Sequence, residues 1–458
     1  MPKDPVPGLL TRATELLEGE FAALPDFDPA TSGSVDPVAM VHVLETVAHR
    51  LGDNYPYFHP LYAGQMLKPP HPLARAAYAL AMTLNPNNHA RDGGRASSEM
   101  EIEAVRHIAG MFDWSEFLGH LTSSGTFANL EALWVAGRLA PGRRILGSTQ
   151  AHYTHRRISA VLQLPYDEIA ADSRGRMDLD ALEAELRNGD VSTVVVTLGT
   201  TAMGAVDPLD RILELRSRYG FRVHVDAAYG GYFRLIPEAL DEPARRAYAV
   251  LGDADSIVID PHKHGLQPYG CGCVLFRDPA VGRFYRHDSP YTYFTSSQLH
   301  LGEISLECSR AGASAVALWA THQLLPLTPG GEFAHGLARG RTAALELDRR
   351  LRADARFQPL AAGPPELDIV VWKLHTPDAA RASELAQRVF AGCAAHDLHL
   401  ALVQLPHSWF GTAPVAENSD PQESVTCLRS VLMKPEHEDW LDRIWERFTA
   451  ACADVMAE

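Results

Sequence analysis

Lys263 stands in the segment SIVIDPHKHG, directly after an apolar run, and its side chain ends in an amine that can condense with an aldehyde. Such a reaction needs a lysine that is partly withdrawn from water, because burial lowers the pKa of the amine. A second apolar run, CGCVLF, follows shortly after. A surface lysine is the common alternative, but core elements on both sides predict an enclosed loop.

Asp226, in the segment HVDAAYGG, ends another apolar run. A buried carboxylate without a partner costs several kcal/mol, so this one needs a partner. A protonated pyridine nitrogen would be such a partner, and the charge pair would keep its ring electron-poor. A carboxylate that caps the next segment is the alternative.

Two further segments hold groups suited to a flat ligand with a phosphate. The segment TSSGTFANL has small polar residues at a predicted helix start, where free amides bind phosphate; an ordinary helix cap is the alternative. The segment QAHYTHRR offers His152, whose ring could stack on a flat cofactor, and the neighbouring His155 is not distinguished from it by spacing alone.

These segments lie at the ends of predicted strands. Short runs rich in β-branched residues, uninterrupted by polar alternation, are typical of strands buried on both faces. Helical stretches such as LDALEAELRN lie between several of them, which predicts βαβ units and a mostly parallel sheet. In such sheets ligands bind beyond the carboxyl ends of the strands. The runs occupy residues 143–148, 193–200, 221–228, 255–260 and 271–277.

The composition excludes several classes of protein. With 46% hydrophobic and 21% charged residues, the chain is globular rather than disordered. A net charge of -16 argues against a nucleic-acid partner. No apolar window is long enough for a membrane span, and the N-terminus has no signal-peptide core. The six cysteines show no paired spacing, so we expect buried thiols, no metal site and a cytoplasmic location.

Taken in order, TSSGTFANL, QAHYTHRR, TLGTTAMGAVDPL, HVDAAYGG and DPHKHG resemble the group II pyridoxal-phosphate-dependent amino acid decarboxylases, which include glutamate, aromatic amino acid, tyrosine and diaminobutyrate decarboxylases. The resemblance covers roughly residues 50–330. It implies an α/β PLP-dependent transferase of the aspartate-aminotransferase-like class, fold type I. We expect an N-terminal helical, dimerising segment (1–85), a large PLP-binding domain (86–330) and a C-terminal α+β small domain (331–458).

The resemblance also implies roles for single residues. Lys263 would hold pyridoxal 5'-phosphate as a Schiff base, Asp226 would pair with its pyridine nitrogen, and His152 would stack on the ring and take part in catalysis. The remaining cofactor contacts would come from Ser124, Gly125, Thr126, Thr200, Ala228 and His262.

Two departures from the family concern the cofactor loop. The family commonly has asparagine before Pro261 and often a large residue after the lysine, where this chain has Asp260 and His264. The stretch HDSPYTYFTSSQLHLGE corresponds to the loop that supplies a protonating tyrosine, and Tyr291 and Tyr293 are the candidates. If no acid reaches Cα, oxygen attack would give an aldehyde instead of an amine.

The expected reaction is removal of the α-carboxylate of an L-amino acid to give an amine and CO2. His59, Tyr62 and Arg429 are the predicted substrate-binding residues, and the aromatic surroundings of the first two favour an aromatic substrate. Arg91 and Arg95 are further candidates for binding a carboxylate. An aldehyde synthase, a transaminase, a carbon-carbon lyase and a silent relative are the alternatives. Family members are usually homodimers with shared sites, so we expect a homodimer.

Overall fold

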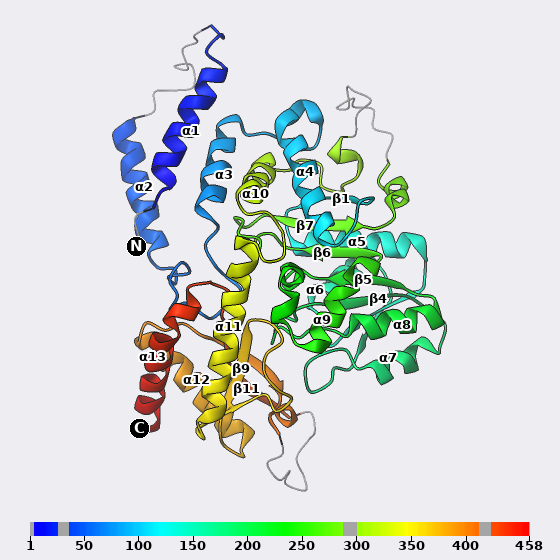
Figure 1. The fold of residues 1–458 in the computed structure, drawn as a ribbon, viewed down its shortest axis with the longest axis vertical. Helices are drawn as coiled ribbons and strands as arrows, with labels where there is room; N and C mark the ends of the chain where they lie inside the picture. Colours follow the sequence, from blue (N-terminus) through cyan, green and yellow to red (C-terminus); the bar gives the residue numbers. More distant parts are fainter. Residues whose placement is uncertain (1–3, 26–35, 287–299, 412–422, 458) are drawn as a thin grey trace.

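The computed structural model describes residues 4–25, 36–286, 300–411 and 423–457. A seven-stranded sheet in the order β1-β7-β6-β5-β4-β2-β3 forms its centre (Figure 1). Strands β2 to β6 run parallel, and β7 pairs antiparallel with both β1 and β6. The predicted mostly parallel α/β class is confirmed. The strands are β1 (Leu118–Thr122), β2 (Arg144–Ser148), β3 (Tyr166–Ile169), β4 (Val191–Thr197), β5 (Arg222–Asp226), β6 (Ser256–Ile259) and β7 (Gly272–Phe276).

Apolar side chains cover both faces of this sheet, because successive residues of a strand point to opposite sides. On one face Val194 and Val223 belong to a core that includes α4, α7, α8 and α9. On the other face Val195 and Val258 pack against α5 and α6. The uninterrupted apolar runs follow from this double burial. The helices are α4 (Arg95–Met111), α5 (Gly125–Leu139), α6 (Thr154–Val161), α7 (Leu179–Leu186), α8 (Leu209–Tyr219) and α9 (Glu242–Ala249).

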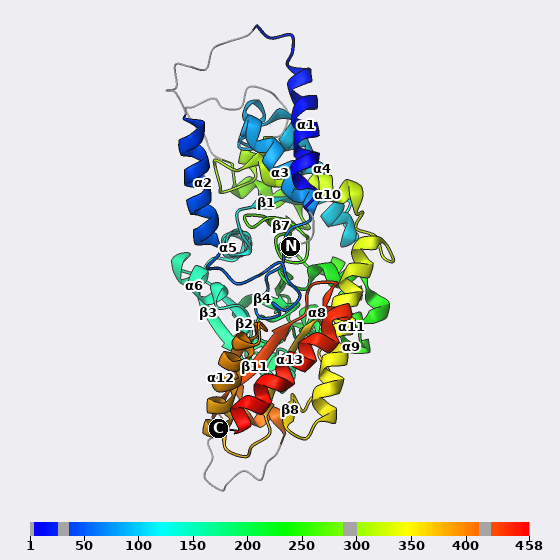
Figure 2. The ribbon, with the colours of Figure 1, turned by 90° about the vertical axis from the view of Figure 1, so that its left-hand side faces the viewer.

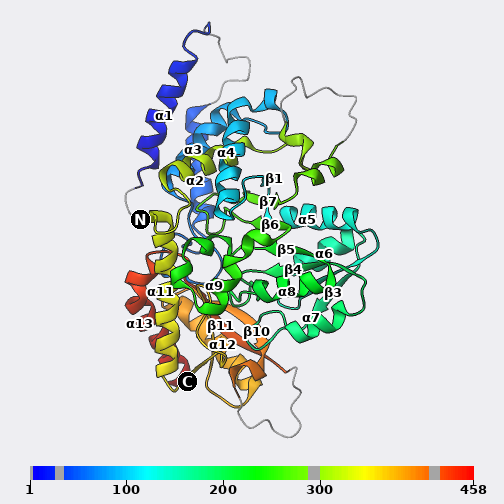
Figure 3. The ribbon, with the colours of Figure 1, turned by 45° about the vertical axis from the view of Figure 1, so that its right-hand side comes forward.

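A second, antiparallel sheet in the order β10-β11-β9-β8 lies beside the large one with three helices (Figures 1 and 3). Its core includes Trp372, whose ring meets that of Phe448 edge-on at 5.4 Å. The predicted domain boundaries stay a prediction. The elements are α11 (Glu332–Ala353), β8 (Phe357–Pro359), β9 (Ile369–Leu374), α12 (Ala379–Ala395), β10 (Ala401–Pro406), β11 (Ser424–Val431) and α13 (His437–Ala457). Short 3-10 helices occupy Arg91–Gly93, Gly231–Leu235, Pro237–Ala239, Leu251–Asp253, Pro279–Phe284, Leu301–Glu303 and His407–Phe410.

The N-terminal helices are α1 (Val6–Glu20), α2 (Pro37–Leu51) and α3 (Pro72–Leu84). Helix α3 packs on α10 (Gly312–Leu324), and α1 packs on α3. Helix α2 has no buried residue and projects from the body of the protein (Figure 2). No helix in the described part of the chain is long and apolar enough to cross a membrane.

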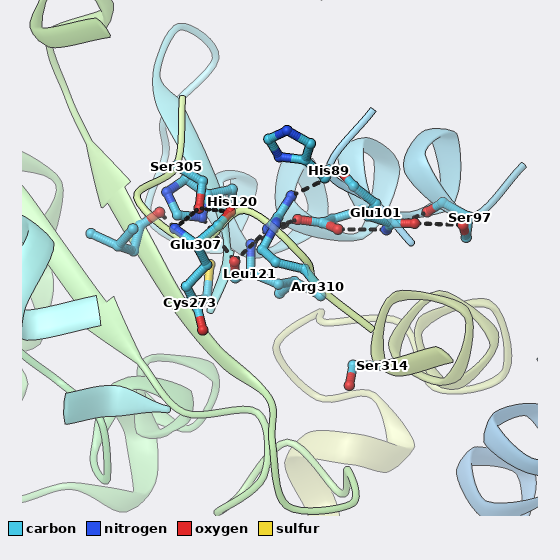
Figure 4. A network of polar contacts seen from close by, with 12 residues as sticks. His89, Ser97, Glu101, His120, Leu121, Cys273, Ser305, Glu307, Arg310 and Ser314 are labelled. Carbon is cyan, nitrogen blue, oxygen red and sulfur yellow. Dashed lines mark hydrogen bonds and ion pairs between the residues drawn. The ribbon is translucent and has the colours of Figure 1, made fainter. Parts of the chain in front are cut away.

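A buried polar network joins α4, β1 and the segment that precedes α10 (Figure 4). Glu101 accepts hydrogen bonds from Arg310 Nη1 at 2.7 Å and from Leu121 N at 3.0 Å. Asn88 Nδ2 donates to the second oxygen of Glu101 at 2.7 Å. Glu307, from the same segment as Arg310, accepts from Ser123 N at 2.9 Å. The network therefore fixes the turn between β1 and α5.

We predict that Arg310→Ala lowers the free energy of unfolding by about 3–5 kcal/mol, because the buried Glu101 loses its charged partner. The control Arg349→Ala removes the exposed ion pair with Glu346 and should cost less than about 1 kcal/mol. Urea unfolding followed by circular dichroism measures both. Equal losses in the two variants would contradict this account of the network.

Candidate active site

Three of the predicted residues follow three neighbouring parallel strands. Thr200 comes after β4, Asp226 ends β5, and Lys263 lies in the loop after β6. The register pairs Thr197 with Asp226 and Asp226 with Val258, so the carboxyl ends of the strands meet at one edge. This is the edge of an open α/β sheet at which ligands bind.

Asp226 is buried and ionised. Its Oδ2 lies 2.8 Å from Nε2 of His155, and its Oδ1 accepts from Ala228 N at 3.1 Å. Burial alone would raise the pKa of this carboxyl group, but the hydrogen bond from His155 and the positive charges of His155 and Lys263 lower it overall. The carboxylate therefore stays negative at the end of β5, where it can balance a cation.

Lys263 lies in a tight loop that begins at the end of β6. Its Nζ is 3.2 Å from Oδ2 of Asp260, and its backbone N donates to Asp260 O at 2.9 Å. The side chain is 22% exposed, so the amine is neither sealed in the core nor free in solvent. The enclosed loop expected from the flanking strands is present.

The histidines beside the lysine have different surroundings. Nδ1 of His262 lies 2.6 Å from Cys271 O, which can only accept, so Nδ1 carries a proton. Burial lowers the pKa of His262. His264 is fully buried against Tyr229 and Phe233, and its Nε2 is 3.4 Å from Asp368. His264 thus belongs to the core behind the lysine loop.

The structure separates the two histidines that spacing left undecided. His155 is fully buried and bound to Asp226. His152 is half-buried, and its ring lies 4.4 Å from that of Tyr153 at an angle of 30°. Burial lowers the pKa of His152, and the charges of Asp226 and Lys263 also act on it. His152 therefore lies near both groups with a largely neutral ring.

The predicted phosphate segment forms the N-terminus of α5. Ser124 is the cap residue, and its hydroxyl accepts from Phe127 N at 3.2 Å. Gly125 is buried and Thr126 is exposed. The first amides of a helix lack partners within it, which makes them suitable for an anion. A Cβ at Gly125 would lie 2.5 Å from Oδ2 of Asp260, so this helix end is next to the lysine loop.

Thr200 and Ala228 complete the strand ends. The hydroxyl of Thr200 accepts from Ala205 N at 3.0 Å, and the residue is fully buried. Its hydroxyl proton remains for a further acceptor. Ala228 is 7% exposed and presents only a methyl group beside Asp226.

The predicted substrate residues lie near one another but away from Lys263: Tyr62 N donates to His59 O at 3.0 Å, and the charge of Arg429 acts on Tyr62. His59 contacts Leu61 N and the ring of Trp440, and it lines a cavity of about 560 Å³ beside α13. Tyr62 is buried, and its ring lies 4.9 Å from that of Tyr57. Neither residue contacts Lys263 in the described part of the chain.

Arg429 is buried, although an arginine beside a strand is more often part of a surface ion pair. Its guanidinium donates to Thr201 O at 2.7 Å, Ala202 O at 3.0 Å and Gly64 O at 3.3 Å. Among the described residues no carboxylate lies within ion-pair distance of it. Arg429 therefore holds the loop after Thr200, and the charge of Asp368 acts on it from beyond ion-pair distance.

The other candidates lie elsewhere. Arg91 pairs with Glu99 on α4. Tyr291 and Tyr293 fall outside the described residues.

Sequence reasoning did not assign roles to His155 or Asp260. The available signal for His155 was a second histidine three residues after His152, in the first turn of α6. Asp260 stood out only as a departure from the family asparagine.

The donor set fits pyridoxal phosphate. Three groups suited to this cofactor lie at neighbouring strand ends. They are the amine of Lys263 for the aldehyde, the ionised carboxylate of Asp226 for the ring nitrogen, and the amides at the start of α5 for the phosphate. The buried Oδ1 of Asp260 has no hydrogen-bond partner among the described residues, and it lies next to Gly125 at the start of α5.

Residues 56–375 match the model of the pyridoxal-dependent decarboxylase conserved domain. An L-tyrosine decarboxylase of Enterococcus faecium is 26% identical, over 91% of this chain and 88% of its own. The structure of Oryza sativa TDC with PLP and tryptamine has a TM-score of 0.77 at 17% identity, covering 100% of this chain and 99% of that one. Rhodiola rosea 4-hydroxyphenylacetaldehyde synthase has a TM-score of 0.75 at 19% identity, covering 99% and 94%.

We predict that His155→Leu lowers the free energy of unfolding at pH 7 by about 3 kcal/mol, because it leaves Asp226 buried and unpaired. In the parent chain the pKa of Asp226 lies below its unfolded value of about 3.9, so the pair stabilises the fold above that pH, and its contribution is lost as the pH falls through the folded-state pKa. In the variant, burial raises the pKa, so the deficit should shrink as the pH falls from 7 towards 4.

Thermal melts across this pH range measure the difference, and Ser159→Ala, a buried position on the same helix α6, is the control. Serine does not titrate in this range, so the control should show a small change that does not depend on pH. A deficit in His155→Leu that stays constant from pH 7 to pH 4 would contradict the ion pair.

Proposed function

The chain belongs to the pyridoxal-dependent decarboxylase family, and on that premise we propose that it removes the α-carboxylate of an aromatic L-amino acid to give an amine and CO2, with its cofactor held as a Schiff base on Lys263. Pyridoxal 5'-phosphate is the cofactor, and the chain is a carboxy-lyase of amino acids. The observation that carries the detailed proposal is the convergence of Lys263 with an ionised Asp226 at adjoining strand ends.

Each residue of the site has a role that follows from its surroundings. Pyridoxal phosphate, when bound, supplies an electron-poor conjugated ring that accepts the electron pair of a bond broken at Cα. Asp226, kept charged by His155, holds a proton on the ring nitrogen. His152 would stack on one face of the ring, and Ala228 would contact the other. Lys263 would provide the amine that holds the cofactor.

The phosphate would be held at the start of α5. Ser124, Gly125 and Thr126 offer hydroxyl groups and helix-end amides, and His262 is proposed to add a contact from the lysine loop when its Nε2 also carries a proton. Thr200 offers its hydroxyl proton to the ring oxygen of the cofactor.

The proposed preference for an aromatic substrate rests on the N-terminal segment. Tyr55, Tyr57 and Tyr62 form an aromatic cluster there, and the charge of Arg429 acts on Tyr62. The Enterococcus faecium relative is an L-tyrosine decarboxylase. Arg429 is proposed to attract the substrate carboxylate. His59, which lines the cavity beside α13, is proposed to lie at the entry to the substrate site.

The proton that ends the reaction at Cα is proposed to come from Tyr291 or Tyr293. Both residues stay sequence-based predictions. The fold is also that of an aldehyde synthase, so the product has to be identified chemically.

The functional unit is proposed to be a cytoplasmic homodimer. The large apolar side chains of α2 are exposed, from 44% at Val47 to 76% at Val38. An apolar helix face of this kind is typical of a surface covered by a partner, and a second copy of the chain is the proposed partner. The cytoplasmic location rests on free cysteines, of which those at 271, 273, 393, 427 and 452 are buried.

The test is to incubate the purified protein and pyridoxal phosphate with single amino acids while CO2, ammonia and the organic product are measured. We expect CO2 and an amine from tyrosine, phenylalanine or tryptophan, without ammonia. Ammonia with an aldehyde would replace the proposal by an aldehyde synthase. A product that forms only with a 2-oxo acid present would indicate a transaminase.

Lys263→Ala should abolish the visible absorbance of the bound cofactor and lower CO2 release at least about a thousandfold. The control Lys373→Met removes a buried lysine of β9, which donates to Thr376 O, and should keep the absorbance. Spectra and CO2 release of both variants measure the effect. A coloured, active Lys263→Ala variant would contradict the assignment.

Val41→Glu combined with Leu44→Glu should convert the dimer to a monomer, because two buried carboxylates would lack partners in the interface. His42→Glu on the polar side of the same helix is the control and should remain dimeric. Sedimentation velocity distinguishes the two species. A parent chain that sediments as a monomer would contradict the proposed interface.

A further inference from the structure

Asp260 places a carboxylate against the start of α5. A Cβ at Gly125 would lie 2.5 Å from its Oδ2 and 2.7 Å from its Oδ1. Asp260 is 2% exposed, and its Oδ1 has no hydrogen-bond partner within the described ranges. A polar oxygen buried in this way is costly unless something else meets it. Because a carboxylate oxygen only accepts hydrogen bonds, a phosphate at this helix end would not satisfy it and would meet its negative charge.

A second carboxylate is already bound at the same helix end. Glu307 accepts the hydrogen bond of Ser123 N at 2.9 Å. Ser124 uses its hydroxyl to cap Phe127 N. One amide before α5 and one within its first turn are thus occupied by groups of the chain itself. Fewer donors remain there for a phosphate, and two negative side chains lie close to it.

The positive charges around Asp260 are few. Lys263 Nζ lies 3.2 Å from Oδ2 and His262 Nε2 lies 3.5 Å from it. Burial lowers the pKa of His262, so Lys263 is the main cation. Among the described residues, the charge of Asp260 also acts on the titratable groups of His152, Tyr232, Tyr269, Cys271 and Cys273. None of these five is an additional lysine or arginine.

We propose that Asp260 weakens the binding of the cofactor's phosphate group by placing a negative charge at the start of α5, so that the enzyme holds pyridoxal phosphate less tightly than its other contacts would allow. The inference rests on the proposed function, in which α5 binds that phosphate. Two anionic groups that lie close together in a buried site repel each other. The carboxylate also pairs with Lys263, and this second effect acts on any aldehyde, with or without phosphate.

The two effects separate when two ligands are compared. Pyridoxal has the same aldehyde and ring as pyridoxal phosphate but lacks the phosphate. Dissociation constants of both ligands are measured by titration, with the visible absorbance and tryptophan fluorescence as signals, for the parent chain and for Asp260→Asn. Asparagine has nearly the same shape and no charge, so the variant is expected to fold, and its melting temperature checks this.

We expect Asp260→Asn to bind pyridoxal phosphate more tightly, with a gain in affinity about tenfold larger than any change for pyridoxal, which responds only to the loss of the Lys263 pair. The control Asp348→Asn removes a buried carboxylate from α11, where it pairs with Arg352, and should leave the ratio of the two constants unchanged. The rate of cofactor release from the loaded Asp260→Asn enzyme should fall in parallel.

An equal change for both ligands would overturn the inference, because Asp260 would then act only through Lys263. An unchanged or weaker affinity for pyridoxal phosphate would overturn it as well. A parent chain that binds neither ligand would refute the proposed function, and the inference with it.

Discussion

A carboxylate that stays charged inside the protein is the constraint on which the site depends. Asp226 ends a buried strand, where burial favours its neutral form. His155 reverses this by approaching to 2.8 Å from α6, on the same face as α5. Without this contact the strand could still form, but its end would carry an unpaired buried group or a neutral acid. A neutral acid would be a poor partner for a cationic ring nitrogen.

The parallel sheet brings the other residues of the site next to Asp226. Because β4, β5 and β6 are adjacent and parallel, the residues that follow them meet at one edge. The loop after β6 has a fixed shape, since His262 N donates to Cys271 O and Lys263 N donates to Asp260 O. Arg429 reaches the loop after Thr200 from the second sheet. The amine and the carboxylate are thus held by backbone geometry rather than by long flexible side chains.

The sequence was most informative where local physics decides the structure. Strands buried on both faces are continuous apolar runs, so β2 and β4 to β7 were predicted at nearly their observed positions. Strands β1 and β3 were not predicted. The first contains Gly119 and His120 and the second has exposed acidic residues, so neither shows an apolar run.

The sequence predicts which residue types form the site and in which order they follow along the chain, but not which of them contact one another. Which histidine pairs with Asp226 depends on how α6 packs against β5, and spacing does not encode it. The burial of Arg429 depends on two segments more than 200 residues away in the chain. The position of Asp260 against α5 depends on the closure of the lysine loop onto another helix. These are long-range contacts, which motifs do not contain.

The most direct test of the central claim is to load the protein with pyridoxal phosphate, reduce it with borohydride and locate the adduct by peptide mass spectrometry. Reduction makes the bond between the cofactor and its lysine permanent. The account predicts one adduct, on the peptide that contains Lys263. An adduct on another lysine, or none, would contradict it.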